Sequence, residues 1–364
     1  MKVKVVSKRI IWETIDSLHN YAGWPSVARL QNGKLALTAS AFRLNHICPF
    51  GKCVISYSED EGKTWTLPAP VIDTPLDDRD GGITAFGKSS VIVTSFNNSV
   101  QFQRDQAGRN ASHCAKKYRD YVNAYLDVLE RDDEWKNYLG SMFRISHDCG
   151  VTFGEVKKIP VTCPHGPAAG PAGTLLYIGR LFFEDEEVQG EDSRLVAYRV
   201  FQDGSFEPLG KIKSPGAGFL SYEPHAIVLP DGKVLVHIRM EKEDKSLFTI
   251  FQCESYDGGK TFTMPHQILA DKGGAPAHLI LNGDTLISTY GYRLEPYGIR
   301  AMFSRDFGKT WDADHVLVDD GASWDIGYPS SVVLKDGSIL TVYYGKTESD
   351  GPAKIMQVNW KYED

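Results

Sequence analysis

The stretch SRDFGKTW, from Ser304 to Trp311, decides the fold because its pattern recurs along the chain. The pattern is Ser-x-Asp-x-Gly-x-Thr followed by Trp or Phe, and further copies start at Ser58, Ser146 and Ser255. A polar turn between two apolar stretches is typical of a β-hairpin. In each copy we expect the glycine to take a positive φ, the aspartate to accept backbone N–H bonds and the aromatic ring to pack into the sheet. The motif therefore predicts a repeated structural unit and not a catalytic site.

A second repeat runs in phase with this hairpin motif. Its segments share one plan, which is a proline, a short apolar strand, a turn containing Gly and a second apolar strand; they start at Pro25, Pro224, Pro276 and Pro329, with weaker copies at Gly82 and Pro167. The copies recur at intervals of about 50 residues, the length of a four-stranded propeller blade. The sequence therefore predicts an all-β fold, a six-bladed β-propeller that forms a single domain over residues 1–364. The N-terminal strand is expected to complete the last blade and so to close the ring.

One segment departs from the strand pattern and predicts a helical insertion. Residues 106–139 interrupt the second blade between its second and third strands. Their apolar side chains follow the three- and four-residue spacing of a helix. These side chains are Tyr118, Tyr121, Val122, Tyr125, Leu126 and Leu129. A helix packed on the rim of the blade, a lid over a pocket and a contact in a homo-oligomer are the three alternatives.

Composition excludes several classes of function. The chain has 364 residues, of which 42% are hydrophobic, and a formal charge of −7 without long blocks of like charge, so neither nucleic acid nor a membrane surface is a predicted partner. Its six cysteines form no CxxC pair, and it has no P-loop or dinucleotide fingerprint, so we predict no metal and no cofactor. The N-terminus lacks the long apolar run of a signal peptide, which predicts a cytoplasmic protein with free thiols.

With these features, the chain resembles the sialidase, or neuraminidase, superfamily over nearly its whole length. The hairpin motif is similar to the Asp boxes of that family, which mark the architecture better than the activity. Strand direction alternates within a blade. The loops before the first strand and after the second strand therefore gather at the end of the propeller opposite to the hairpin motifs, and we expect the site there.

The resemblance implies roles for four residues. The family uses a tyrosine nucleophile assisted by a glutamate, an aspartate as acid/base and three arginines that bind the substrate carboxylate. Tyr328 resembles the nucleophile, and Glu223 in SYEPHAIVL resembles the assisting glutamate. Arg239 resembles the second arginine, and Arg293 is the candidate for the third, with Arg300 as its competitor.

The sequence departs from the family pattern at two places. Trp24 stands where the family has its first arginine, and Arg43 and Arg79 are the candidate replacements. The loop AFRLNHICPFGK has no acidic residue, although the family's aspartate belongs there. The candidate proton donors are therefore His46, Asp78 and Asp80. These departures argue against ordinary sialic acid and for another acidic sugar or a different leaving group.

Further polar and aromatic residues are expected at the same end of the propeller. The substrate-binding candidates are Trp24, Arg43, Arg79, His165, Arg180, His225, Arg239, Tyr292, Arg293 and Asp325. Arginines are suited to bidentate capture of a carboxylate. The sequence thus predicts an exo-acting glycoside hydrolase that removes a terminal acidic sugar from a glycan. The alternatives are a carbohydrate-binding propeller without catalysis and a uronic-acid lyase in which His46 or His165 acts with a tyrosine.

Overall fold

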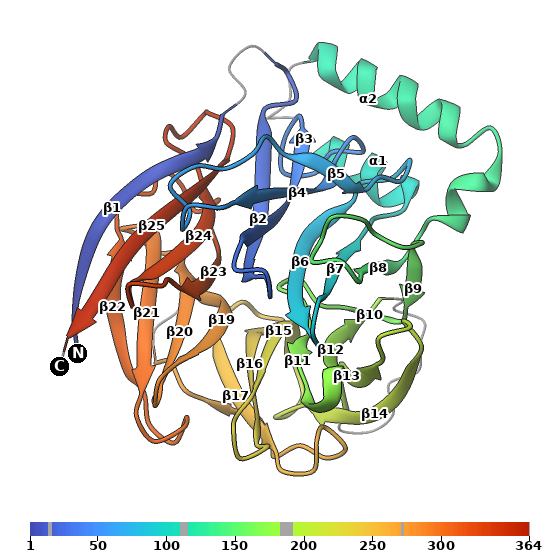
Figure 1. The fold of residues 1–364 in the computed structure, drawn as a ribbon. Helices are drawn as coiled ribbons and strands as arrows, with labels where there is room; N and C mark the ends of the chain where they lie inside the picture. The colour runs from blue at the N-terminus through green and yellow to red at the C-terminus, as the bar shows by residue number, and fades with distance from the viewer. Residues whose placement is uncertain (14–16, 110–115, 183–191, 271–272, 364) are drawn as a thin grey trace.

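The computed structural model describes residues 1–13, 17–109, 116–182, 192–270 and 273–363. Its strands form six antiparallel sheets arranged around a common axis, so the predicted six-bladed β-propeller is confirmed (Figure 1). Blade 1 contains β2 (Tyr21–Arg29), β3 (Leu35–Arg43), β4 (Lys52–Ser58) and β5 (Ala69–Ile72). Blade 2 contains β6 (Arg79–Phe86), β7 (Ser90–Phe96), β8 (Ser141–Ser146) and β9 (Lys157–Ile159). Blade 3 contains β10 (Val161–Thr162), β11 (Ala168–Ala169), β12 (Leu175–Leu181), β13 (Asp192–Val200) and β14 (Phe206–Lys213).

The other three blades follow in chain order and have four strands each. Blade 4 contains β15 (Phe219–Val228), β16 (Val234–Lys242), β17 (Phe248–Ser255) and β18 (His266–Gln267). Blade 5 contains β19 (Gly274–Asn282), β20 (Thr285–Tyr292), β21 (Gly298–Ser304) and β22 (Asp312–Val318). Blade 6 contains β23 (Gly327–Val333), β24 (Ile339–Gly345), β25 (Lys354–Glu363) and β1 (Lys2–Trp12). The first strands of neighbouring blades contact one another and surround the axis.

The last blade is closed by the N-terminal strand, as the sequence predicts. β1 pairs antiparallel with β25, with Lys2 opposite Glu363, and the two ends of the chain lie side by side (Figure 1). The second strands of the blades are buried on both faces; Leu35 and Leu37 of β3, for example, pack with Leu340 and Val342 of β24. Closure therefore pairs the outer edge of blade 6 and adds Ile11 and Trp12 to the apolar cluster between blades 6 and 1.

The hairpin motif has the predicted structure. In the Ser304 copy, Asp306 Oδ1 accepts a bond from Thr310 N at 2.9 Å, and Gly308 has a φ of 88°. The structure also explains the serine, because Ser304 Oγ accepts from Gly308 N at 2.8 Å and donates to Asp306 at 2.7 Å. Trp311 Nε1 donates to Gln252 of blade 4 at 2.8 Å. Each fixed position therefore holds the turn or ties one blade to the next.

Loss of this turn is expected to lower stability without touching the site. Asp306→Ala removes the acceptor for Thr310 N and for Thr310 Oγ1, which donates at 2.7 Å. We expect the free energy of unfolding to fall by about 1–3 kcal/mol, measured by urea denaturation. Asp284→Ala, at an exposed turn between β19 and β20, is the matched control and should change it little. Equal stability of the two variants would contradict the structural role of the motif.

The helical insertion lies in blade 2, between β7 and β8, as predicted, but it starts earlier. It consists of α1 (Val100–Arg109), α2 (Lys116–Leu129) and a 3₁₀ turn (Asp133–Asn137). The sequence prediction of a start at residue 106 was wrong, because α1 lacks the apolar periodicity that marks α2. Val122 and Leu126 of α2 pack with Leu76 and Val100, and α2 runs along the outer edge of the propeller (Figure 1). α2 therefore packs on the rim of blade 2, whereas Phe102 of α1 lines a cavity described below.

Two further predictions concern the environment of the chain. The five described cysteines are free thiols, and the sixth, Cys114, lies outside the described residues. Within the described ranges no helix has both the length and the apolar character needed to cross a bilayer. In blade 3 the turn at Asp203 and Gly204 joins β13 to β14, and Asp203 Oδ1 accepts from Ser205 N at 2.9 Å.

Candidate functional site

A cavity of about 300 Å³ opens at the end of the propeller away from the hairpin motifs. It is lined by Trp24, His46, Arg79, Asp80, Phe96, Glu223, Arg239, Arg293, Trp324 and Tyr328. Eight of these ten residues are sequence candidates; Phe96 and Trp324 are not. Only their positions in the repeat could have indicated them, since Phe96 ends a second strand and Trp324 precedes a first strand. Neither residue type points to a specific chemistry.

Four first strands deliver their side chains to this cavity through the same irregularity. Trp24, Asp80, Glu223 and Tyr328 have φ values of 54°, 49°, 46° and 49°. At each of them the pairing with the second strand shifts, as in a β-bulge, and the next residue is proline or, after Asp80, glycine. A non-glycine residue in the left-handed region costs about 1–3 kcal/mol, and such positions cluster at functional sites. Four equivalent bulges around one axis therefore mark this cavity as the candidate site.

Tyr328 and Glu223 form the centre of the cavity. The Tyr328 hydroxyl donates to Glu223 Oε1, and Arg239 NH1 donates to both Glu223 oxygens at 2.8 and 2.9 Å. Burial and the neighbouring Glu223 carboxylate raise the pKa of Tyr328 well above its ordinary value. Burial lowers the pKa of the Arg239 guanidinium, but the neighbouring Glu223 carboxylate raises it, and the net shift of the pKa is upward. The phenol therefore keeps its proton at rest and has a carboxylate in place to receive it.

Asp80 faces the same cavity as an acid that holds its proton. Its Oδ1 is buried and has no hydrogen-bond partner among the described residues. Burial raises the pKa of Asp80 to about 7, although the nearby Arg79 opposes this shift. A buried carboxyl with a pKa near neutrality is a suitable proton donor in catalysis.

A second proton-transfer group lies at the boundary of blades 1 and 6. His46 Nδ1 is 3.0 Å from Asp325 Oδ1, and the Tyr21 hydroxyl donates to Asp325 Oδ2 at 3.0 Å. Because the Asp325 carboxylate only accepts, His46 Nδ1 carries the hydrogen and Nε2 keeps its lone pair. Burial lowers the pKa of His46, while the His46 hydrogen bond overcomes burial and lowers the pKa of Asp325 to about 2. The pair is thus an oriented neutral imidazole beside an ionised carboxylate.

Three arginines give the cavity its positive character. The Arg79 guanidinium packs 4.1 Å from the centre of the Trp24 ring and donates to the His46 carbonyl at 2.9 Å. Arg293 Nε donates to the Ile326 carbonyl at 2.9 Å. Arg239 is the third.

Arg239 is shared between Glu223 and Glu241, and Arg79 lies 3.5 Å from Asp77, whereas the hydrogen bonds of Arg293 go to the Ile326 carbonyl and the Tyr344 hydroxyl. The Arg293 guanidinium is therefore the cation of the lining best placed to favour an anionic ligand.

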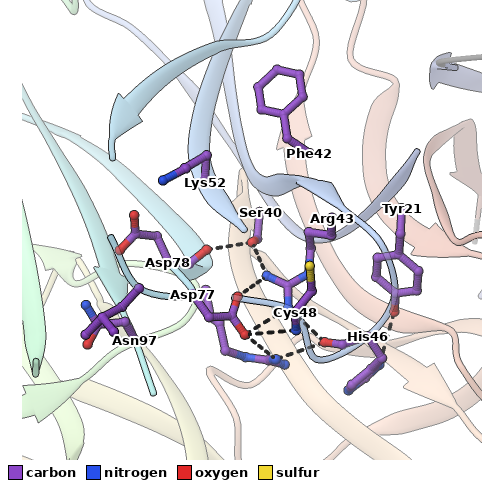
Figure 2. Close-up of polar contacts among 12 residues, drawn as sticks. Tyr21, Ser40, Phe42, Arg43, His46, Cys48, Lys52, Asp77, Asp78 and Asn97 are labelled. Carbon is purple, nitrogen blue, oxygen red and sulfur yellow. Dashed lines mark hydrogen bonds and ion pairs between the residues drawn. The ribbon is translucent and has the colours of Figure 1, made fainter. Parts of the chain in front are cut away.

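Arg43 is not part of this lining. It is completely buried, with an ion pair from its NH1 to Asp77 Oδ1 and a bond to Ser40 Oγ at 2.8 Å (Figure 2). Asp77 also lies 3.5 Å from Arg79 NH1, and burial of its carboxylate is outweighed by Arg43 and Arg79, which lower the pKa of Asp77. The sequence assigned Asp77 no catalytic or substrate-binding role. It holds the two arginines in position, and only Arg79 reaches the cavity.

Other sequence candidates lie elsewhere. Asp78 is buried against Thr74, whose N and Oγ1 both donate to it at 2.7 Å, and burial raises the pKa of Asp78 to about 7. Tyr292 packs beneath Arg300, whose guanidinium is 3.5 Å from the ring centre and pairs with Asp314. Neither Asp78 nor Tyr292 lines the cavity, and Arg293 rather than Arg300 does. Arg180 lines an adjoining cavity described below.

His165 and His225 lie below the site, in the central channel. With His278 they line a separate cavity of about 310 Å³, and the rings of His225 and His278 stack at 4.2 Å. The Nδ1 atoms of His225 and His278 accept backbone N–H bonds from Leu279 and Ser331 at 3.0 and 3.3 Å. Their Nε2 atoms therefore carry hydrogens and are not available as metal ligands. Across the described ranges, no group of three or more His, Cys, Asp or Glu could hold a metal ion.

Comparison with known proteins bears on the fold. No family model and no curated protein matches the sequence. A protein of unknown function from Dyadobacter fermentans is similar, with 20% identity, a TM-score of 0.75 and 99% of each chain covered. An intramolecular trans-sialidase from Ruminococcus gnavus shows 13% identity, a TM-score of 0.61 and 96% coverage of each chain. The chain has a sialidase-like fold.

A further match to this sialidase-like propeller comes from a mutant of Trypanosoma rangeli sialidase that displays trans-sialidase activity. It shows 14% identity and a TM-score of 0.61, and the match covers 98% of this chain and 58% of the trypanosomal protein. The sialidase-like propeller described here therefore spans little more than half of that enzyme. At these levels of identity the likeness establishes the architecture and leaves the chemistry to the residues of the cavity.

Proposed function

We propose that the protein is an exo-acting glycoside hydrolase that removes a terminal acidic sugar from a glycan. The observation that carries this proposal is the contact of the Tyr328 hydroxyl with Glu223, backed by Arg239, at the floor of a cavity lined by arginines. A tyrosine nucleophile is a known exception to the paired carboxylates of most glycosidases. The sialidase-like fold supports the proposal and does not by itself establish it.

The arrangement suits a double displacement. As the Tyr328 oxygen attacks the anomeric carbon, its proton passes to Glu223, and the bond from that carbon to the leaving oxygen breaks. Asp80 gives its proton to the leaving oxygen. A water molecule then attacks the anomeric carbon and gives a proton to Asp80, while the bond to Tyr328 breaks and Glu223 returns the proton to the phenol. Two inversions at one carbon give net retention of configuration.

The substrate is proposed to carry a carboxylate. Arg293 has donors that are not engaged by the Ile326 carbonyl or the Tyr344 hydroxyl, and Arg79 lies in the same lining. Arg239 is engaged by Glu223 and Glu241 and is proposed to position Glu223.

Trp24 occupies the place where the resemblance implies a further arginine. Its ring instead packs against Arg79 and is 2% exposed, so it shapes the wall and positions Arg79. We therefore propose an acidic sugar other than ordinary sialic acid.

The oriented His46 and Asp325 pair favours one other reaction, a β-elimination. An imidazole with a free Nε2 lone pair can remove the proton beside a carboxylate that the arginines neutralise. The same Nε2, once protonated, could serve the hydrolase as a donor. The two reactions give different products, since elimination leaves an unsaturated sugar that absorbs in the ultraviolet.

Turnover of a glycoside panel tests the proposal. Aryl glycosides of sialic, other ulosonic and uronic acids and of neutral sugars would be incubated with the protein, and aryl release and ultraviolet absorbance recorded. We expect release from one acidic glycoside with a kcat/KM at least about 100-fold above any neutral one, because an unmatched arginine cluster rejects a sugar without a carboxylate. Ultraviolet absorbance would indicate the lyase. Saturable sugar binding without any product would indicate the binding protein and contradict the hydrolase.

A further inference from the structure

A second cavity, of about 460 Å³, adjoins the candidate site. The two cavities share Asp80, Phe96 and Glu223 in their linings and are therefore continuous at these residues. The first cavity lies toward blades 1, 5 and 6, where Trp24, Arg293 and Tyr328 are found. The second extends toward blades 2, 3 and 4, and outside the shared residues Arg180 is the sequence candidate in its lining.

The walls of the second cavity differ in character from those of the first. Apart from the three shared residues, its lining includes Phe102, Leu139, Leu181, Phe182 and Tyr222 and one arginine, Arg180, whereas the first cavity has three arginines. Two guanidinium groups lie over the Tyr222 ring of this wall, Arg180 at 4.7 Å and Arg239 at 5.5 Å from its centre. The space is thus suited to a flat apolar or aromatic group rather than to a second charged sugar.

The helical insertion supplies part of this wall. Phe102 belongs to α1, and Leu139 follows the 3₁₀ turn that ends the insertion. The position of α1 is fixed from below, since Val100 is buried and Gln103 Nε2 donates to Asp77 Oδ2 at 2.9 Å. Asp77 is the residue that also holds Arg43 and Arg79. The insertion is therefore tied to the site through a buried polar network and not merely laid on its rim.

We propose that the second cavity binds the leaving group of the substrate, and that this group is aromatic or otherwise apolar. The inference rests on the proposed function and deepens it. A general acid must lie within hydrogen-bond reach of the glycosidic oxygen. Asp80 is at the junction of the two cavities, so the bond to be broken lies at the junction as well. The acidic sugar then occupies the arginine-lined cavity, and the group that departs occupies the apolar one.

Binding of the free leaving group tests this assignment without turnover. 4-Methylumbelliferone would be titrated into the wild type, Phe102→Ala and Val128→Ala, with its fluorescence polarisation as the readout. Val128 is an exposed residue of α2 that lines neither cavity, which makes it the matched control. We expect the Kd to rise about tenfold in Phe102→Ala, through loss of ring contact, and to stay within about twofold in Val128→Ala. Failure of the wild type to bind the dye would overturn the proposal.

Kinetics on three glycosides of one acidic sugar separate the leaving-group cavity from the sugar cavity. For Phe102→Ala we expect KM to rise about tenfold for the 4-methylumbelliferyl glycoside and to stay unchanged for the methyl glycoside and the glycosyl fluoride, which have no aromatic group. An equal rise for all three would mean that the second cavity holds part of the sugar, and would overturn the proposal. If the wild type binds the dye through Phe102 but hydrolyses no glycoside, the proposed function fails, and with it the leaving-group role.

Discussion

Tyr328→Phe is expected to reduce kcat for the acidic glycoside by at least about 1000-fold while leaving the protein folded. The hydroxyl that is removed is the one that donates to Glu223, and no other described hydroxyl is bonded to that carboxylate. Glu223 keeps its two bonds from Arg239, so its carboxylate is not left unpaired in the cavity. The ring of Tyr328 also keeps its contacts with Trp24 and His165. The loss should therefore appear in turnover and not in thermal stability.

The measurement is kcat and KM for the best glycoside of the panel, with thermal unfolding recorded for each protein. Tyr256→Phe removes a hydroxyl from an exposed tyrosine beside the blade 4 hairpin motif and serves as the control. Mass spectrometry of the wild type with a slow fluorinated substrate would show a sugar attached to Tyr328. Turnover that survives the substitution would remove Tyr328 as the nucleophile and move the chemistry to His46 and Asp325.

The fold could be predicted because its signals are local and repeated. Each hairpin motif specifies its own turn through bonds within eight residues, such as those from Gly308 and Thr310 to Ser304 and Asp306. Repetition then gives the number of blades. Only α1 escaped, because its contacts with the propeller are made by Val100, Gln103 and the side chains around them and not by a periodic apolar face.

The site could be predicted only in part, because convergence depends on contacts between distant segments. Tyr328 and Glu223 are far apart in sequence and meet because equivalent bulges turn both toward the axis. A repeated X-Pro at the start of the first strands is the sequence trace of these bulges. His225, just beyond the bulge at Glu223, instead lines the channel. The ion-pair partner of Arg43 could not be predicted from the sequence. Asp77 rather than Asp78 or Asp80 pairs with Arg43 because both side chains are buried together, which only the three-dimensional structure shows.

Asp80→Asn tests the proposed acid in two ways: we expect the substitution to raise the stability of the protein and to lower its activity. The pKa of Asp80 is about 7 in the folded protein against an ordinary value of 3.8, so between these pH values the folded state holds a proton that the unfolded state has released. The contribution of Asp80 is complete below about pH 4 and is lost as the pH rises to about 7. Asparagine does not titrate. The variant should therefore be about 2–4 kcal/mol more stable than the wild type at pH 8, with no such gain at pH 4.

Activity should move the other way. We expect kcat/KM of Asp80→Asn to fall about 1000-fold for a methyl glycoside, which needs a protonated leaving oxygen, and less than about tenfold for a glycosyl fluoride, which does not. In the wild type, kcat/KM for the methyl glycoside should fall about tenfold for each pH unit above about 7, as Asp80 loses its proton. Asp78→Asn is the comparison: the pKa of its carboxyl is also about 7, but Thr74 donates to both of its oxygens, and an amide nitrogen would replace one of these acceptors. We therefore expect its gain in stability at pH 8 to be smaller than that of Asp80→Asn. If Asp80→Asn cleaves both substrates normally and His46→Gln does not, the proton comes from His46.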